Sequence, residues 1–440
     1  MLKKHVLLRG ALMLTCAGMF SRLIGFFYRI FLSRTIGAEG IGLYQLIFPL
    51  YAMAISMTSS GISTSISKLV SSKNAVNNRK GAMDVLFCGL SVSLFLSICV
   101  SGFFFFFHRF LAIHYIHEVR TSEFIRIMAW SVPIASVHAC IEAYYFGLKN
   151  TAVPACCQVF SNVIRMMALV LAIFMEQANI WKVTPSLAVY ILVLEEVASA
   201  SFSVIALSIQ LSGQHILPYH IPSMKNTLAE IAAIAFPLSL NRVLVNVLQS
   251  IENLMIPIQL QVYGFSASKS LSLYGILHGM AMPLILFPTV LSFSLSTILL
   301  PVMSEAQVKK NFSYVRQTIL KTCFSCTLLG IFFWSIFFFF GRDIAGLIYE
   351  NETAGDFIRT LSWICPLLYL NPALTTILNG LGETKRIFYH NLIGLSIRIL
   401  FVILGVPKYG ISSVFWGILA NQFLFFILAI CHFYRHIDRQ

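Results

Sequence analysis

The chain has 440 residues, of which 58% are apolar and only 11% are charged, and its mean hydropathy is +0.81. A water-soluble protein cannot cover its surface with so few charges, so the composition excludes soluble enzymes, nucleic-acid-binding modules and secreted disulfide scaffolds. The formal net charge of +14 has to be interpreted by position, because basic residues collect in the cytoplasmic loops of membrane proteins.

The predicted elements are helices that cross a membrane. A helix needs about 20 residues to cross the hydrocarbon core of a bilayer, and twelve apolar segments of about that length or more follow one another along the chain. They lie near residues 8–33, 41–67, 82–108, 122–148, 153–176, 184–211, 227–259, 270–303, 316–340, 356–381, 387–405 and 411–433. The sequence therefore predicts an all-α polytopic membrane protein with about 12 transmembrane helices.

The basic residues between these spans predict the orientation. If the N-terminus is cytoplasmic, 17 lysines and arginines lie on the inner side and 9 on the outer side. Because cytoplasmic loops carry an excess of Lys and Arg, both termini are expected in the cytoplasm.

The chain repeats itself at an offset of 233 residues. Residues 104–165 align with residues 337–398 without a gap and share 16 identities in 62 positions. The identities include the arginine pairs 109/342, 126/359 and 165/398, together with matching Trp, Pro and Gly residues. Matches of these residue types at one offset indicate an internal duplication.

Each half of the duplication contains six predicted spans, and an even number gives both halves the same orientation in the membrane. We therefore expect two pseudo-symmetric six-helix bundles, at 1–211 and 227–440, related by an axis along the membrane normal. The stretch 212–226 contains Gly213, Pro218 and Pro222 and is the expected cytoplasmic linker.

Five arginines fall in the interior of predicted spans: Arg22, Arg29, Arg165, Arg242 and Arg398. Such residues are costly in lipid and normally face a protein interior or a watery cavity. Arg22 and Arg29 are seven residues apart and share one helical face with Gly25. Two guanidinium forks at this spacing suit a diphosphate. The alternative is that Arg29 extends to the outer interface and Arg22 pairs with a glutamate.

Four glutamates also lie inside predicted spans: Glu142, Glu195, Glu196 and Glu252. They are candidates for coupling transport to an ion, and the alternative is that they are counter-ions of the arginines. Glu195 and Glu196 point about 100° apart on a helix, so they cannot both face the same partner.

The seventh predicted span carries a polar stripe of Arg242, Asn246, Gln249 and Asn253 at helical spacing. The stripe fits the polar wall of a substrate cavity better than a lipid-facing surface. Hydrogen bonding between helices is the alternative.

The remaining polar patterns predict no cofactor and no metal site. Cys323 and Cys326 form a single CxxC in apolar surroundings, whereas a metal site of this type needs a second pair. The histidines 108, 114 and 117 beside Arg109 and Arg120 are interpreted as part of a solvated outer loop.

Four short segments resemble a known family. They read FSRLIGFFYR at 20–29, GAEGIGLYQ at 37–45, ISK at 66–68 and LNGLGETK at 378–385. In these segments the chain is similar to the stage V sporulation protein B and polysaccharide flippase family. That family belongs to the MOP superfamily, with the MATE exporters, the O-antigen flippases and the lipid II flippase MurJ.

The resemblance implies a MOP/MATE-like fold and a transporter rather than an enzyme. Such a protein moves an undecaprenyl-linked oligosaccharide or a peptidoglycan precursor across the bacterial cytoplasmic membrane by alternating access. Its implied partners are a polyprenyl-diphosphate-linked sugar, the bilayer and a coupling ion, H⁺ or Na⁺, with no nucleic acid, and the protein is expected to be a monomer. In MurJ, arginines of the first-helix motif contribute to the diphosphate site. Arg22 corresponds to that motif directly, and Arg29 lies one residue later than the motif's second arginine.

Two other functions compete with this interpretation. A MATE-type multidrug exporter favours cationic drugs and an acidic cavity, and a first helix with two arginines and no acid argues against it. A membrane-embedded transferase is less expected, because no acidic metal motif or His/Asp pair stands in an exposed loop.

Overall fold

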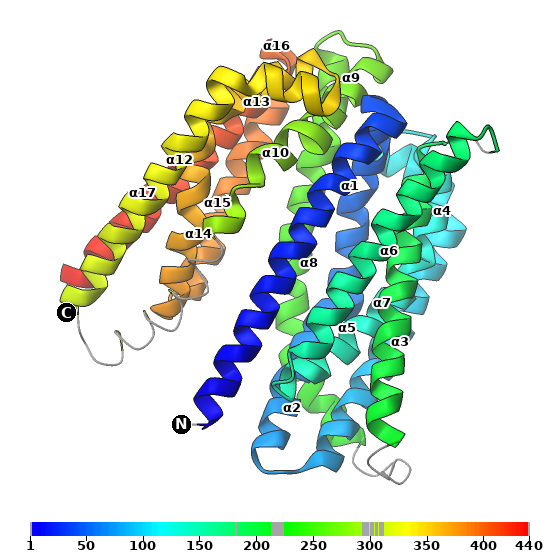
Figure 1. Cartoon of the computed structure of the whole chain (residues 1–440), viewed down its shortest axis with the longest axis vertical. Coiled ribbons are helices and arrows are strands. Elements are labelled where there is room, and N and C mark those ends of the chain that lie inside the picture. Colours follow the sequence, from blue (N-terminus) through cyan, green and yellow to red (C-terminus); the bar gives the residue numbers. More distant parts are fainter. Residues whose placement is uncertain are drawn as a thin grey trace. The chain divides into compact units, whose positions relative to one another are not determined.

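The computed structural model describes residues 2–180, 183–212, 224–292 and 312–438, together with the isolated positions 299, 303 and 307. Within these residues every regular element is a helix (Figure 1). The helices of the first part of the chain are α1 (Leu2–Ile55), η1 (Ser56–Ser60), α2 (Gly61–Ala75), α3 (Arg79–Phe110), η2 (Leu111–Ile116), α4 (Thr121–Ala129), α5 (Ser131–Gly147), α6 (Ala152–Gln177), α7 (Ser186–Ser212) and α8 (Met224–Val262).

The later helices are α9 (Ala267–Gly275), η4 (Ile276–Ala281), α10 (Met282–Leu286), α12 (Phe312–Tyr349), α13 (Glu352–Leu361), η5 (Ser362–Ile364), α14 (Cys365–Gly380), α15 (Thr384–Leu400), η6 (Phe401–Gly405), α16 (Val406–Tyr409) and α17 (Ser412–Asp438). The predicted all-α fold is confirmed.

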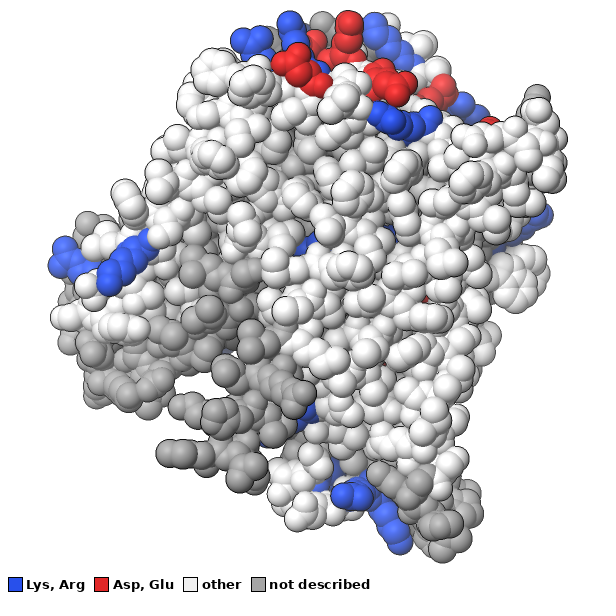
Figure 2. Space-filling view, in the orientation of Figure 1, with Lys and Arg blue, Asp and Glu red and all other residues white. Residues whose placement is uncertain are grey.

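Nine of the described helices are long and apolar enough to cross a membrane, or ten if α4 and α5, bent by 42°, form one span. The sequence predicts twelve, and two features account for the difference. The stretch Thr15–Ala75 counts as one helix but covers the expected spans 8–33 and 41–67. The expected span 270–303 extends into residues outside the described ranges. On the face that Figure 2 draws, the described charged side chains gather near helix ends, as expected for a membrane protein.

The long first helix is interrupted at Gly37. Its backbone angles are φ 70° and ψ 175°, a conformation that glycine adopts without the steric cost of a Cβ atom. The chain can therefore leave one helical direction and begin another at this point, which lies between the first two expected spans.

The chain divides into two compact units by its internal contacts. Unit 1 comprises residues 1–36 and 43–250, and unit 2 comprises residues 37–42 and 251–440. This division passes through α8, between Ser250 and Ile251, whereas the expected bundles divide at the linker 212–226. Most of that linker lies outside the described residues, and the two symmetric bundles stay a prediction.

The core of unit 1 lies between α2, α3 and α5, which pack against one another. Ile66, Val70 and Leu86 are fully buried there. Gly147 of α5 lies so close to Val70 that an added Cβ would meet the valine side chain at 2.7 Å. Small residues allow such close packing between membrane helices, where no hydrophobic effect drives association.

Candidate functional site

Arg22 and Arg29 of α1 are exposed, whereas Ser21 and Tyr28 on the neighbouring face are buried. Arg22 and Arg29 are separated by two helical turns, about 10 Å along the axis. They lie on the same side of the helix, with Gly25 between them. α1 therefore presents a basic strip beside its buried face, and we call Arg22, Gly25 and Arg29 the α1 basic strip.

The opposite side of α1 is apolar. Phe20, Leu23, Phe27 and Phe31 are all exposed, and at 100° per residue they cluster on the side of the helix away from the basic strip. Exposed large apolar side chains on a membrane helix are suited to lipid. The helix thus separates an apolar side from a basic side.

Arg165 of α6 reaches the α1 basic strip. Its guanidinium carbon lies 4.6 Å from the centroid of the Tyr28 ring, an arrangement in which the ring face attracts the cation. A Cβ atom on Gly25 would lie 3.3 Å from Nη2 of Arg165, so the glycine leaves room for this approach. The structure therefore places Arg165 against Gly25, and Arg22 and Arg29 lie about one helical turn to either side of this glycine on α1.

The charge of Arg165 is compensated locally. Its Nη1 donates to Oε2 of Glu195 on α7 at 2.9 Å, and its Nη2 donates to Oδ1 of Asn162 at 2.9 Å. Both ionic side chains are about one-fifth exposed. Glu195 therefore acts as a counter-ion, the alternative noted for it from the sequence.

Tyr28, Tyr44 and Asn162 complete this cluster, and the sequence analysis did not select them. Tyr44 is buried and lies close enough to Arg29, Arg165 and Glu195 to interact with them electrostatically. Tyr28 could have been selected from the sequence because it lies three residues after Gly25, on the neighbouring face of the helix. Asn162 could have been selected in the same way, because it lies one turn before Arg165 on α6.

Arg398, the repeat counterpart of Arg165, is also paired with a glutamate, in unit 2. Its Nη2 lies 2.6 Å from Oε1 of Glu252 on α8, and the Glu252 side chain is only 2% exposed. A buried carboxylate requires such a partner. Arg398 and Glu252 are thus held together as an ion pair.

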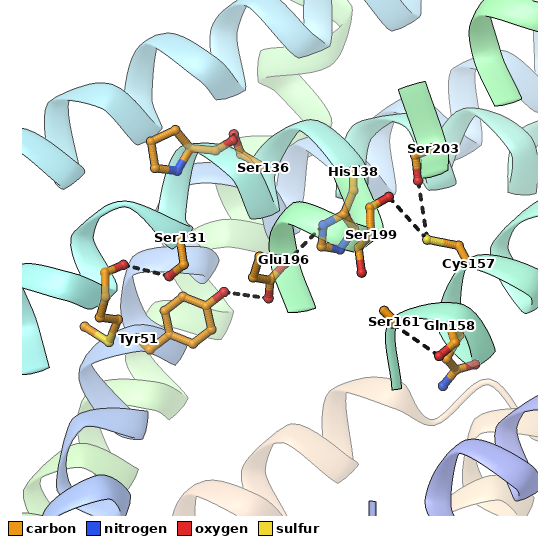
Figure 3. A network of polar contacts seen from close by, with 12 residues as sticks. Tyr51, Ser131, Ser136, His138, Cys157, Gln158, Ser161, Glu196, Ser199 and Ser203 are labelled. Carbon is orange, nitrogen blue, oxygen red and sulfur yellow. Dashed lines mark hydrogen bonds and ion pairs between the residues drawn. The ribbon is translucent and has the colours of Figure 1, made fainter. Parts of the chain in front are cut away.

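Glu196 belongs to a separate network in unit 1 (Figure 3). The hydroxyl of Tyr51 donates to Oε1 of Glu196 at 2.8 Å, and Nδ1 of His138 lies 3.2 Å from Oε2. Glu142, one turn after His138 on α5, lies close enough to the imidazole to interact with it electrostatically. Glu195 and Glu196 have different partners, as their offset of about 100° predicts.

The polar stripe of α8 bonds to the second half of α1 and the helices that follow it. Nη1 of Arg242 donates to the carbonyl oxygen of Ser60 at 2.9 Å and also contacts the Ser60 hydroxyl. Nδ2 of Asn246 donates to the carbonyl oxygen of Ala52 at 3.2 Å and to Oγ of Ser56 at 2.5 Å. These contacts match the interhelical alternative for Arg242 and Asn246. Gln249, the third residue of the stripe, is exposed.

In the part of the chain that the structure describes, no group of three or more His, Cys, Asp or Glu residues has an arrangement that could hold a metal ion. The polar chemistry of the site is that of arginines, their counter-ions and hydroxyl groups. Such a site can bind an anion and can exchange protons at carboxylates and imidazoles.

Comparison with known proteins gives two family matches. The family described as "Polysaccharide biosynthesis protein" matches residues 7–307, and the MatE family matches residues 237–404. The first match covers more than half of the chain and includes the α1 basic strip, Arg165 and the Glu196 network.

Individual proteins agree with these matches. The chain is 27% identical over 436 residues to the stage V sporulation protein B of Bacillus subtilis (strain 168), covering 97% of this chain and 83% of that protein. It is 25% identical over 182 residues to the lipid II flippase MurJ of the same organism, covering 38% of this chain and 32% of MurJ.

A solved structure shares the fold. It is the inward-facing conformation of a multidrug resistance MATE family transporter of the MOP superfamily, with a TM-score of 0.77, 16% sequence identity and coverage of 95% of each chain. The fold expected from the sequence is confirmed by this likeness.

Proposed function

Because the chain belongs to the polysaccharide biosynthesis protein family and is a membrane transporter of the MOP superfamily, we propose that it is a flippase for a polyprenyl-diphosphate-linked sugar. The substrate is an undecaprenyl-linked oligosaccharide or a peptidoglycan precursor, which crosses the bacterial cytoplasmic membrane by alternating access.

The observation that carries this proposal is the exposure of Arg22 and Arg29 on one side of a membrane helix. Residues 2–36 contain no Asp or Glu, so all the charged residues in this part of α1 are basic. A guanidinium fork matches the oxygens of a phosphate group, and two forks about 10 Å apart can contact a diphosphate from both ends.

The apolar side of α1 supports assigning the basic strip to the substrate. An arginine at the membrane centre costs about 2.5–3.5 kcal/mol on insertion scales, and α1 already has Phe20, Phe27 and Phe31 exposed on its other side. In the proposed mechanism the phenylalanines face lipid, and Arg22 and Arg29 face the aqueous path of the substrate head group.

Arg165 and Arg398 have a different role in this proposal. Each is held by a glutamate, which offsets its positive charge within the protein. The guanidinium of Arg165 lies over the Tyr28 ring and packs beside Gly25 of the α1 basic strip. The polar residues Arg242, Asn246 and Gln249 complete the proposed substrate-binding set on α8, with the first two also bonding to neighbouring helices.

We assign ion coupling to Glu196 and Glu142, and we treat Glu195 and Glu252 as counter-ions. Glu196 lies against Tyr51 and His138, and the charged groups closest to this network are Glu142, Glu195 and Arg165. A carboxylate beside an imidazole favours H⁺ over Na⁺, because hard metal cations prefer oxygen ligands. Protonation of Glu196 would change its bonds to α1 and α5 within one unit.

The proposed arrangement keeps the expected bundles at 1–211 and 227–440, the linker 212–226, cytoplasmic termini and a monomeric protein.

The competing function is a MATE-type exporter of cationic drugs, which the match of the MatE family to residues 237–404 supports. The basic side of α1 favours an anionic substrate instead.

Reconstitution in proteoliposomes tests the proposed function. Purified protein is supplied with a fluorescent undecaprenyl-diphosphate oligosaccharide in one experiment and with a fluorescent cationic drug in the other. We expect movement of the lipid-linked sugar between leaflets and none of the drug. Drug transport without lipid movement would establish the exporter instead.

A further inference from the structure

A pocket of about 590 Å³ lies where α3, η2 and α4 meet in unit 1. Three arginines line it, Arg109, Arg120 and Arg126, together with His108, Ser122 and Glu123. The sequence predicts a solvated outer loop here, and the pocket is a feature that the sequence alone does not indicate.

Two of these arginines have no partner among the residues that the structure describes. Arg120 is held by Glu118, with Nε 2.8 Å from Oε1. Among the described residues, neither Arg109 nor Arg126 forms a hydrogen bond or an ion pair. The single acid in the lining, Glu123, leaves the pocket with a net positive charge after the pairing of Arg120.

The internal repeat supplies a comparison within the same chain. Arg109, Glu123 and Arg126 correspond by the offset of 233 to Arg342, Asp356 and Arg359 of unit 2. There, Nε of Arg342 donates to Oδ1 of Asp356 at 2.7 Å. Arg359 lies over the Phe338 ring at 4.9 Å. In the second copy of the motif both arginines therefore have a partner. In the first copy Arg109 and Arg126 have none among the described residues.

Two substitutions between the copies explain the difference. Unit 2 has Gly341 and Gly355, and a Cβ on Gly355 would lie 2.7 Å from the Cα of Arg342, so α12 and α13 approach closely there. Unit 1 has His108 and Ser122 at the corresponding positions. Their side chains bond to each other, with Nδ1 of His108 2.8 Å from Oγ of Ser122. The side chains of this pair lie between α3 and α4, and we infer that they keep open the space that the glycines close in unit 2.

The surroundings of the pocket are those of a lipid head-group region. Ile113 and Val119 line it and are exposed, and Phe106 and Phe110 are exposed on the adjoining end of α3. Arg109 lies in the last turn of α3, within the candidate membrane span Arg79–Ile116. A ligand here meets guanidinium groups on one side and apolar side chains on the other.

We propose that this pocket binds the phosphate of an anionic phospholipid head group, with Arg109 and Arg126 as the ligands. A guanidinium binds phosphate oxygens through paired N–H donors. The exposed apolar residues beside the pocket contact the acyl chains. This site is distinct from the α1 basic strip and from the proposed transport of the sugar lipid.

The test measures the melting temperature of the purified protein in neutral detergent with added phosphatidylglycerol, phosphatidylcholine or glycerol 3-phosphate. A ligand that binds only the folded state raises this temperature. The variant Arg109→Gln/Arg126→Gln is compared with Arg342→Gln/Arg359→Gln, which loses the same net charge from the other copy of the motif.

We expect phosphatidylglycerol to stabilise the wild type and the Arg342→Gln/Arg359→Gln control more than phosphatidylcholine does. The stabilisation should fall by at least half in Arg109→Gln/Arg126→Gln. If phosphatidylglycerol stabilised both double variants equally, Arg109 and Arg126 would not bind the lipid and the proposed site would be wrong. Equal protection by glycerol 3-phosphate would overturn the lipid assignment in favour of a soluble phosphate.

A second variant covers the case in which Arg109→Gln/Arg126→Gln does not fold. His108→Gly/Ser122→Gly keeps both arginines but copies the glycines of unit 2. It should let Arg109 pair with Glu123 and should lose the preference for phosphatidylglycerol. An unchanged preference in this variant would contradict the role of the His108–Ser122 pair in opening the pocket.

Discussion

The guanidinium of Arg398 lies 2.6 Å from the carboxylate of Glu252. Its repeat-related counterpart, Arg165, is also held by a glutamate, Glu195, at 2.9 Å. The arginine is duplicated in the two halves, but its counter-ion is not, because one glutamate lies on α7 and the other on α8. In each half the charge of the membrane arginine is therefore neutralised by a glutamate, but the glutamate comes from a different helix.

The first prediction concerns this ion pair. Glu252→Gln should destabilise the protein by about 3 kcal/mol, the low end of the range for a broken buried pair, because it leaves the half-buried Arg398 without its counter-charge. Replacing both partners, as Glu252→Gln/Arg398→Gln, should recover much of the loss. Thermal unfolding in detergent measures both variants. A double variant no more stable than Glu252→Gln would show that the two side chains do not stabilise each other.

The second prediction concerns the space beside Gly25. Gly25→Ala should be tolerated, since its Cβ would lie 3.3 Å from Nη2 of Arg165 and the flexible guanidinium can shift slightly. Gly25→Leu should displace Arg165 from Tyr28 and reduce transport of the lipid-linked sugar several-fold with little loss of folded protein. The control is Gly18→Leu on the same helix, where an added Cβ would meet nothing within 4 Å. Equal activity of the two leucine variants would contradict a role for the space at Gly25.

The third prediction concerns coupling at Glu196. If Glu196 carries the coupling proton, transport by the wild type should respond to an imposed pH gradient and Glu196→Gln should not respond. Tyr51→Phe removes the hydroxyl that donates to Glu196 and should give an intermediate response. Glu352→Gln, at the start of α13, is the control. A full response to the gradient in Glu196→Gln would exclude this carboxylate as the coupling group.

The sequence was sufficient for the helical fold and for the arginines of the site. Charged residues are so rare in apolar spans that Arg22, Arg29, Arg165 and Arg398 could be found by inspection. The break at Gly37 also fell where two spans were expected.

The partners of these residues could not be predicted, because they come from other helices. The distance from Arg165 to Glu195, or from Glu196 to Tyr51, depends on how α1, α6 and α7 pack, and helical periodicity gives only the face of each residue. The His108–Ser122 pair was missed for the same reason. Its effect became visible only when the repeated segment of unit 2 showed the closed alternative.

The most direct test of the central claim is a charge series at Arg22 in proteoliposomes, with flipping of the lipid-linked sugar normalised to folded protein. Arg22→Lys should be partly active, because it keeps the charge but loses the fork. Arg22→Ala should lose about 10- to 100-fold, since a hydrogen bond to a charged group contributes about 1.5–3 kcal/mol.

Arg22→Glu should be the least active of the series, because a carboxylate repels the diphosphate. The matched control is Arg34→Glu, which reverses the charge of another exposed arginine of α1 outside the α1 basic strip, and it should retain most of the activity. Wild-type flipping by a well-folded Arg22→Glu protein would contradict the anion-binding role of the α1 basic strip, and with it the proposed substrate.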